Sequence, residues 1–126
     1  MQNEKIIITI DETGNMSIPL ELKNIIKKPM LLTFIDENTL IVITENDLVN
    51  IGKSSTKENR RKMLRVLKAN SCEFKLNETN KVEIPDYILK NINFNTGVVI
   101  LNEDGNFKIV NANLVEGLKG NYGKQI

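Results

Sequence analysis

The chain of 126 residues contains no histidine and no tryptophan, and it has a single cysteine, Cys72. A lone cysteine excludes an internal disulfide framework and is typical of a protein from a reducing compartment. Without histidine, the cysteine–histidine pair of a thiol nucleophile cannot form, and a zinc site loses an important ligand type. We therefore expect Cys72 to be a small buried hydrophobe, and we expect no metal and no cofactor.

Long hydrophobic runs are also missing, since none approaches the roughly 18–20 residues that span a bilayer. The apolar run of the N-terminal MQNEKIIITI is too short for a signal peptide, and no small-residue cleavage site follows it. No glycine-rich loop opens a helix in the way that phosphate-binding loops do. These absences predict a cytoplasmic protein that is not an enzyme and has neither a membrane partner nor a small-molecule substrate.

Arginine is scarce, and all three arginines lie between Lys53 and Lys68. That segment holds seven of the 17 basic residues and one acid, Glu58, in a chain whose net charge is only +1. The rest of the chain is therefore net acidic, and the protein as a whole is not a polycation that coats nucleic acid. The length allows one compact domain, or two small halves that share a core.

What the chain does contain is an internal repeat. The phrase ETGNMSIP begins at Glu12, and ETNKVEIP begins 66 residues later at Glu78. Apolar residues alternate with polar ones on both sides of each turn, a pattern that predicts a short hairpin. Gly14 and Asn80 occupy matching turn positions, and both residue types tolerate a positive φ.

A short helical pattern follows each Ile-Pro, and Pro19 and Pro85 suit a first helical turn. A second hairpin follows each helix, as LLTFI-DENT-LIVI and as VVIL-NEDG-NFKIV. Each half is thus expected to run strand, strand, helix, strand, strand. Because about 50 residues bury too little surface to be stable alone, we expect the halves to pack together about a pseudo-twofold axis.

A basic helix is expected between the halves, where Ser55 and Glu58 have capping-box spacing and the helix runs from Thr56 to Ala69. The predicted fold class is α+β and mostly β. Its parts are a first half at residues 1–52, a basic connecting helix at 53–70, a second half at 71–112, and a short C-terminal helix with a flexible tail at 113–126.

Each half resembles the AbrB-type swapped-hairpin unit, because a tight turn joins two strands and the second strand ends in Ile-Pro before a helix. Two such units joined by a basic helix resemble the MraZ family, from about Ile6 to Leu118. The second half carries most of this resemblance: Arg61 and Arg65 precede a small-residue stretch, an acid, a strand and the turn that ends in KVEIP.

The resemblance implies a sequence-specific DNA-binding transcriptional regulator of the bacterial division and cell-wall gene cluster. It implies a homo-oligomeric ring, associated with the nucleoid, whose partner is double-stranded DNA with promoter repeats. Family turns have the form Asp-x-x-Gly-Arg, whereas Asn15 replaces the arginine in the first turn here and Lys81 replaces it in the second. The DNA-contacting turn residues so implied are Thr13, Gly14, Asn15, Thr79, Asn80 and Lys81.

The basic helix has two interpretations. Lys53, Lys57 and Arg60 are candidates for phosphate contacts, whereas Arg61 and Arg65, one helical turn apart, are expected to form ion pairs with a neighbouring subunit or with the other half. Two other functions remain open for the whole chain. It is either a ring-forming assembly protein without DNA binding, which the acidic first turn favours, or an AbrB-type regulator or antitoxin whose main partner is a protein. The two turns also remain open to a plain role as hairpin connections.

Overall fold

The computed structural model describes residues 6–26, 28–51, 58, 61–62, 65, 68–102 and 105–115. In these residues the protein is mostly β with a few short helices, as predicted. The strands are β1 (Ile7–Thr9), β2 (Asn15–Ser17), β3 (Met30–Asp36), β4 (Thr39–Ile43), β5 (Cys72–Phe74), β6 (Lys81–Glu83), β7 (Thr96–Leu101) and β8 (Phe107–Asn111). The helices are α1 (Leu20–Lys23), α2 (Glu45–Ile51), α4 (Asp86–Leu89) and the 3-10 turn η2 (Ala112–Leu114).

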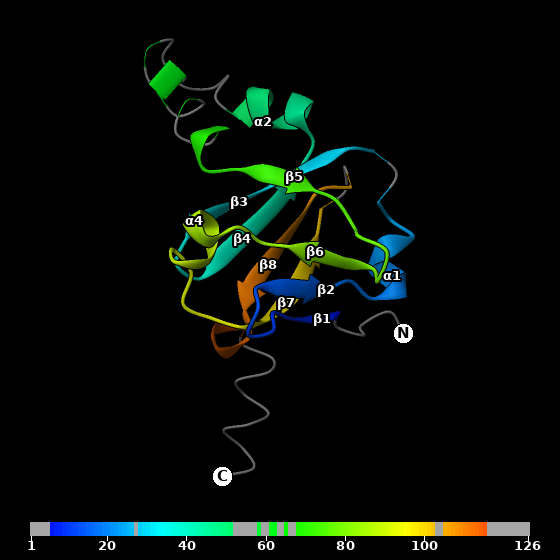
Figure 1. Ribbon diagram of the computed structural model, residues 1–126. Coiled ribbons are helices and arrows are strands. Elements are labelled where there is room, and N and C mark those ends of the chain that lie inside the picture. The colour runs from blue at the N-terminus through cyan, green and yellow to red at the C-terminus, as the bar shows by residue number, and fades with distance from the viewer. Residues whose placement is uncertain are drawn as a thin grey trace.

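The strands form a six-stranded antiparallel sheet and a separate two-stranded ribbon. The sheet has the order β1-β7-β8-β4-β3-β5, and the ribbon consists of β2 and β6. In Figure 1 the ribbon lies across one face of the curled sheet, with α1 and α4 at its two opposite ends. None of the described helices is long and apolar enough to cross a membrane.

Each half of the chain contributes its first strand to the hairpin of the other half. Strand β1 pairs with β7, and β5 pairs with β3, so both edges of the sheet come from the opposite half. The two hairpins, β3–β4 and β7–β8, meet through the β4–β8 pairing at the centre of the sheet. These pairings give each half a backbone ladder that the other half must complete.

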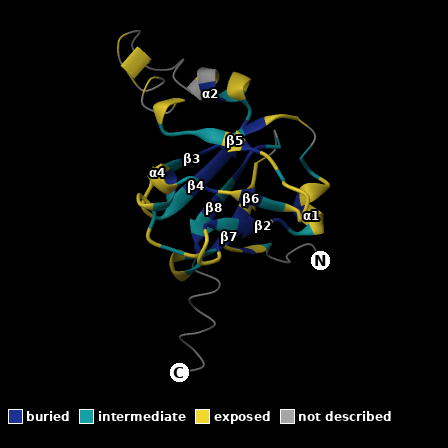
Figure 2. Ribbon diagram, viewed as in Figure 1, coloured by how far each residue is buried: buried dark blue, intermediate teal, exposed yellow. Residues whose placement is uncertain are grey.

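The main core lies between the ribbon and the sheet (Figure 2). Alternation along the ribbon buries Met16 and Val82, which pack with Leu40, Phe107 and Ile109 of the sheet. The opposite sheet face carries a smaller cluster in which Leu48 of α2 packs on residues such as Ile41 and Ile43. The ribbon and α2 therefore cover opposite faces of one sheet.

The predicted hairpin around each repeated phrase is wrong for most of its length. Strands β1 and β2 share only the isolated bridge between Ile10 and Met16, because β1 continues along β7 and β2 along β6. The tight turns do form, since Asp11 N donates to Asn15 O at 3.0 Å and Asn77 N donates to Lys81 O at 2.8 Å. Beyond each turn the strands diverge, and each completes its ladder in the other half, where the shared apolar core lies.

The second hairpins are confirmed as β3–β4 and β7–β8, and short helices follow both Ile-Pro pairs. Pro19 and Pro85 occupy the N-cap positions of these helices, one residue before the first helical turn, and form no side-chain capping hydrogen bond. Helix α2 was not predicted, although Thr44 Oγ1 accepts a hydrogen bond from Asp47 N at 3.1 Å and caps it. The 3-10 turn η2 covers Ala112–Leu114. Most of the C-terminal helix and tail expected at 113–126 lies outside the described residues, so that expectation stays a prediction.

Candidate functional site: the paired turns

The first turn is organised by the carboxylate of Asp11. Its Oδ1 accepts hydrogen bonds from Thr13 N at 2.9 Å, from the Thr13 hydroxyl at 2.7 Å and from Asn15 N at 3.0 Å. Gly14 N donates to Asp11 O at 3.0 Å, and Gly14 has a φ of 84°. Asp11 therefore fixes the backbone of the whole turn through its side-chain Oδ1 and its carbonyl oxygen.

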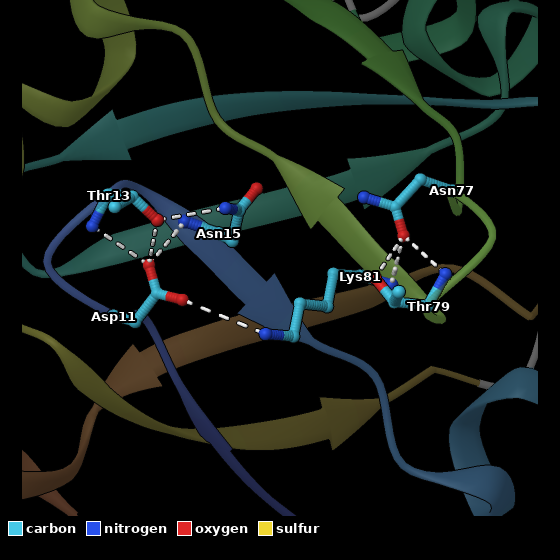
Figure 3. A network of polar contacts seen from close by, with 6 residues as sticks. All are labelled: Asp11, Thr13, Asn15, Asn77, Thr79 and Lys81. Atoms are coloured by element: carbon cyan, nitrogen blue, oxygen red, sulfur yellow. Dashed lines mark hydrogen bonds and ion pairs between the residues drawn. The ribbon is translucent and has the colours of Figure 1, made fainter.

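The second turn repeats this arrangement with an amide in place of the carboxylate (Figure 3). Asn77 Oδ1 accepts from Thr79 N at 2.9 Å, from the Thr79 hydroxyl at 2.7 Å and from Lys81 N at 3.1 Å. Asn80 takes the place of Gly14, with a φ of 62°, and its N–H donates to Asn77 O at 3.0 Å. Because only the side-chain oxygen is needed, aspartate and asparagine hold the same turn.

The ribbon fixes the two turns relative to each other. Ile18 N donates to Asn80 O at 3.1 Å, and Ile84 N donates to Gly14 O at 2.9 Å, so each turn is bonded to the strand end of the other half. Between these bonds, β2 and β6 pair through Met16 opposite Val82. The six predicted turn residues thus lie on one small structural unit: Thr13, Gly14, Asn15, Thr79, Asn80 and Lys81.

The surroundings of the two turns differ. Gly14 is buried, and a Cβ atom at this position would lie 2.7 Å from Leu89 Cδ1 of α4. Asn80 is exposed, and its Oδ1 accepts a hydrogen bond from Lys23 Nζ of α1 at 2.8 Å. Lys23 and Leu89 are themselves 66 residues apart. The same position of the repeat therefore places a hydrocarbon over the first turn and an ammonium group over the second.

The electrostatics of the site are mixed, because the two turns hold three acids, Asp11, Glu12 and Glu78, and one lysine, Lys81. Lys81 Nζ lies 3.9 Å from Asp11 Oδ2, and both side chains are exposed, at 39% and 45%. Such a pair is weak and screened by salt. The pKa of Asp11 is lowered chiefly by the hydrogen bond from the Thr13 hydroxyl and then by the Asn15 N–H, and Lys81 contributes least.

The basic helix is only partly described. Residues 58, 61, 62, 65, 68 and 69 are helical, and the side chains of Arg61 and Arg65 are exposed. Neither arginine forms an ion pair with another described residue, whereas Lys68 Nζ lies 3.9 Å from Glu45 of α2. The predicted phosphate-binding residues Lys53, Lys57 and Arg60 lie outside the described residues. The predicted roles of these three residues and of Arg61 and Arg65 stay predictions.

Lys23 is the residue of this site that the sequence analysis missed. It lies in the short helix that follows the first Ile-Pro, and nothing local links position 23 to a turn at position 80. The signal that could have found it is the repeat itself, in which Lys23 and Leu89 occupy equivalent positions next to equivalent turns.

Metal ligation and thiol chemistry have little support among the described residues. Among the described residues, no group of three or more cysteine, aspartate and glutamate side chains could hold a metal ion. Cys72 is half-buried, and its burial raises the pKa of the thiol, followed by the effect of Glu73, so that the thiol is protonated near neutral pH. The turns instead offer amide and ammonium donors on a rigid frame, because the Thr13 and Thr79 hydroxyls already donate to Asp11 and Asn77.

The fold and the site define a class: a mostly β chain with two sequence repeats that place a matched pair of tight turns on one ribbon. No protein-family model matches the chain. It is similar to a curated protein named transcriptional regulator MraZ, from Mycoplasmoides gallisepticum, with 27% identity over 112 residues. The match covers 85% of this chain and 79% of that relative. This relative confirms the resemblance to MraZ proteins that the repeated motifs indicated.

Proposed function

We propose that this protein is a MraZ-like, sequence-specific DNA-binding transcriptional regulator that assembles as a ring and acts on the division and cell-wall gene cluster. The observation that carries the proposal is the matching set of hydrogen bonds to the side-chain oxygens of Asp11 and Asn77 in the two turns, held on one ribbon (Figure 3). The similarity to a transcriptional regulator over most of the chain supports it. The action is on nucleoid DNA, and no catalytic step is involved.

In this proposal the two halves, residues 1–52 and 71–112, are AbrB-like units related by a pseudo-twofold axis. The exchange of β1 and β5 between the halves supports this arrangement. Such an exchange fixes the spacing of the turns, as a DNA reader requires.

The mechanism is avidity. One ribbon with few cations binds DNA weakly, but a ring that presents several ribbons to repeated DNA sites raises the effective concentration of each later contact. Base contacts come from Thr79, Asn80 and Lys81, and lysines near the turns contact phosphates. Lysine is a point charge, so it does not reproduce the two-pronged contact of arginine with guanine.

The test is fluorescence-anisotropy binding to a duplex taken from upstream of the protein's own coding sequence. A scrambled duplex of the same composition is the reference, and both are titrated at low and near-physiological salt. We expect tight, selective binding to the native duplex that weakens steeply with salt. Equal binding to both duplexes at each salt concentration would refute the proposal that the protein is a sequence-specific regulator.

The role of the turn is tested by Lys81→Glu, which we expect to abolish selective binding while the oligomer keeps its size in analytical ultracentrifugation. Lys108→Glu is the matched control, because Lys108 lies on β8 between buried Phe107 and Ile109 and so projects from the other sheet face. Both variants change the net charge equally. A loss of binding in both variants would show that the assay responds to the net charge of the protein and not to the turn.

The excess of acids over lysines in the turns favours a second candidate, a ring-forming assembly protein that does not bind DNA. Its contacts are apolar subunit contacts, which persist at high salt. An oligomer that is stable in high salt, with no selectivity for the native duplex, would be the result expected for this candidate.

A further inference from the structure

We infer that Lys23 of α1 is a second DNA-binding residue of the Asn80 turn, where it contacts a phosphate and orients the Asn80 side chain toward a base edge. This inference rests on the proposed function and assigns its contacts to one turn of the pair. It follows from the hydrogen bond that joins the two residues across 57 positions of the sequence.

The geometry places the ammonium group at the tip of the turn. Lys23 Nζ lies 2.8 Å from Asn80 Oδ1, and both side chains are exposed. An ammonium group has three donors, so two remain for the oxygens of a phosphate. The Lys23 side chain forms no ion pair with a described acid, in contrast to Lys81, which lies 3.9 Å from Asp11.

The same bond sets the direction of the Asn80 amide. Because Oδ1 accepts from Lys23, the two N–H groups of Nδ2 are left to donate away from α1. The backbone of Asn80 is already used, since its N–H donates to Asn77 O and its carbonyl accepts from Ile18 N. The amide is thus a donor aimed outward from a fixed turn, and it suits an acceptor such as guanine O6 or a purine N7 in the major groove.

The first turn has no equivalent of this pair. Leu89 takes the position of Lys23, and Gly14, which has no side chain, takes the position of Asn80. A hollow of about 470 Å³ lies beside it, lined by apolar residues such as Leu89, Ile92 and Phe94 together with the acids Asp11 and Glu12. Phosphate would be repelled there. The two turns have therefore diverged, and the readout of DNA falls to the turn at Asn80.

The experiment compares Lys23→Met, Lys23→Arg and Lys108→Met in the anisotropy assay, with the native and scrambled duplexes over a series of salt concentrations. Methionine keeps the chain length of lysine and removes its charge and donors, whereas arginine keeps both. Lys108→Met makes the same charge change on the other face of the sheet. Circular dichroism and thermal melting check that each variant is folded, which an exposed side chain should not disturb.

We expect Lys23→Met to lower affinity for the native duplex by about tenfold and to reduce the salt slope by about one. The preference for the native over the scrambled duplex should also shrink, which a plain phosphate contact would not cause. Lys23→Arg should restore the salt slope, and Lys108→Met should match the wild type.

Each other result contradicts a defined part of the inference. If Lys23→Met keeps wild-type affinity and selectivity while Lys81→Glu loses binding, Lys23 has no role in DNA binding. The proposed DNA-binding function would stand. Equal losses in Lys23→Met and Lys108→Met would show an effect of net charge alone. A loss of affinity with unchanged selectivity would leave Lys23 as a phosphate contact and refute its role in orienting Asn80. If the wild type does not distinguish the duplexes, the proposed function fails and the inference fails with it.

Discussion

Met16 and Val82 lie directly opposite each other in the ribbon, and each is the other's counterpart in the 66-residue repeat. Both side chains are fully buried against the sheet. On the sheet, Ile41 lies opposite Lys108, 67 residues later in the chain. The repeat therefore lengthens by one residue between the ribbon and the second hairpin, and the register of both layers is kept despite the insertion.

Truncation of Met16 should test how much the ribbon contributes to the core. Because Met16 is completely buried, Met16→Ala should lower the free energy of unfolding by about 2–5 kcal/mol through lost burial and the cavity left behind. Ser17→Ala, an exposed neighbour in the same strand, is the control and should change stability by less than about 0.5 kcal/mol. Urea unfolding measures both. Similar values for the two variants would mean that the ribbon is not an integral part of the core.

Gly14 is expected to be the less replaceable of two glycines with a positive φ. An alanine Cβ at Gly14 would meet Leu89 Cδ1 at 2.7 Å and Ile84 O at 3.3 Å, whereas at Gly105 nothing lies within 4 Å. Gly14→Ala should therefore cost about 2–4 kcal/mol, from backbone strain and overpacking together, and Gly105→Ala only the strain of about 1–2 kcal/mol. Thermal or urea unfolding separates them, and equal costs would show that Leu89 moves aside freely.

The link between α2 and the second hairpin should also be sensitive to mutation. Asn106 is 3% exposed, its Oδ1 accepts from Thr44 N at 3.2 Å, and its Nδ2 donates to Asp47 Oδ2 at 2.9 Å. Asn106→Ala should destabilise the protein by about 1–3 kcal/mol, because the partly buried Thr44 N–H and Asp47 carboxylate lose their hydrogen bonds to Asn106. Asn46→Ala, exposed in the same helix, is the matched control. If both variants unfold at the same urea concentration, Asn106 has no such role.

The repeat and its turns could be read from the sequence because turn chemistry is local. Asp11 and Asn77 were at fixed offsets from residues that tolerate a positive φ, and the structure places both turns there. Strand partners could not be read in the same way. Ile7 pairs with Val98 and Cys72 with Leu32, and such pairings are decided by which half offers buried surface, not by neighbouring residues.

The same difference between local and distant contacts decides which residues of the candidate site the sequence can indicate. Its turn residues carry a local motif, so the sequence alone is enough to propose them. Lys23 carries none, and its contact with Asn80 depends on how α1 lies against the turn that precedes β6 in the other half. Helix α2 was missed for a different reason, since its seven residues are too few for a clear helical period and only the cap at Thr44 marked it.

Under the proposed function, Asp11 competes with DNA for Lys81, so its removal should strengthen DNA binding. Asp11→Asn keeps the turn, because Asn77 accepts the equivalent hydrogen bonds through an amide oxygen at 2.7–3.1 Å. The variant loses one negative charge and frees Lys81 from its partner at 3.9 Å. We expect affinity for the native duplex to rise about two- to fivefold at low salt, with a smaller gain at high salt.

The control for this prediction is the pH dependence of stability and of DNA affinity in the wild type and in Asp11→Asn. The pKa of Asp11 is lowered from 3.8 by the hydrogen bond from the Thr13 hydroxyl, so the contribution of its carboxylate to stability is present above the unfolded pKa. That contribution is lost as the pH falls through the lower folded pKa. In acid unfolding, Asp11→Asn should lack this loss, and the difference in stability between the two proteins should change only below about pH 4.

Between pH 5 and 7 the carboxylate stays ionised and the chain has no histidine, so the gain in DNA affinity should be constant there. Unchanged or weaker DNA binding by a correctly folded Asp11→Asn protein would show that Lys81 is not held back by Asp11.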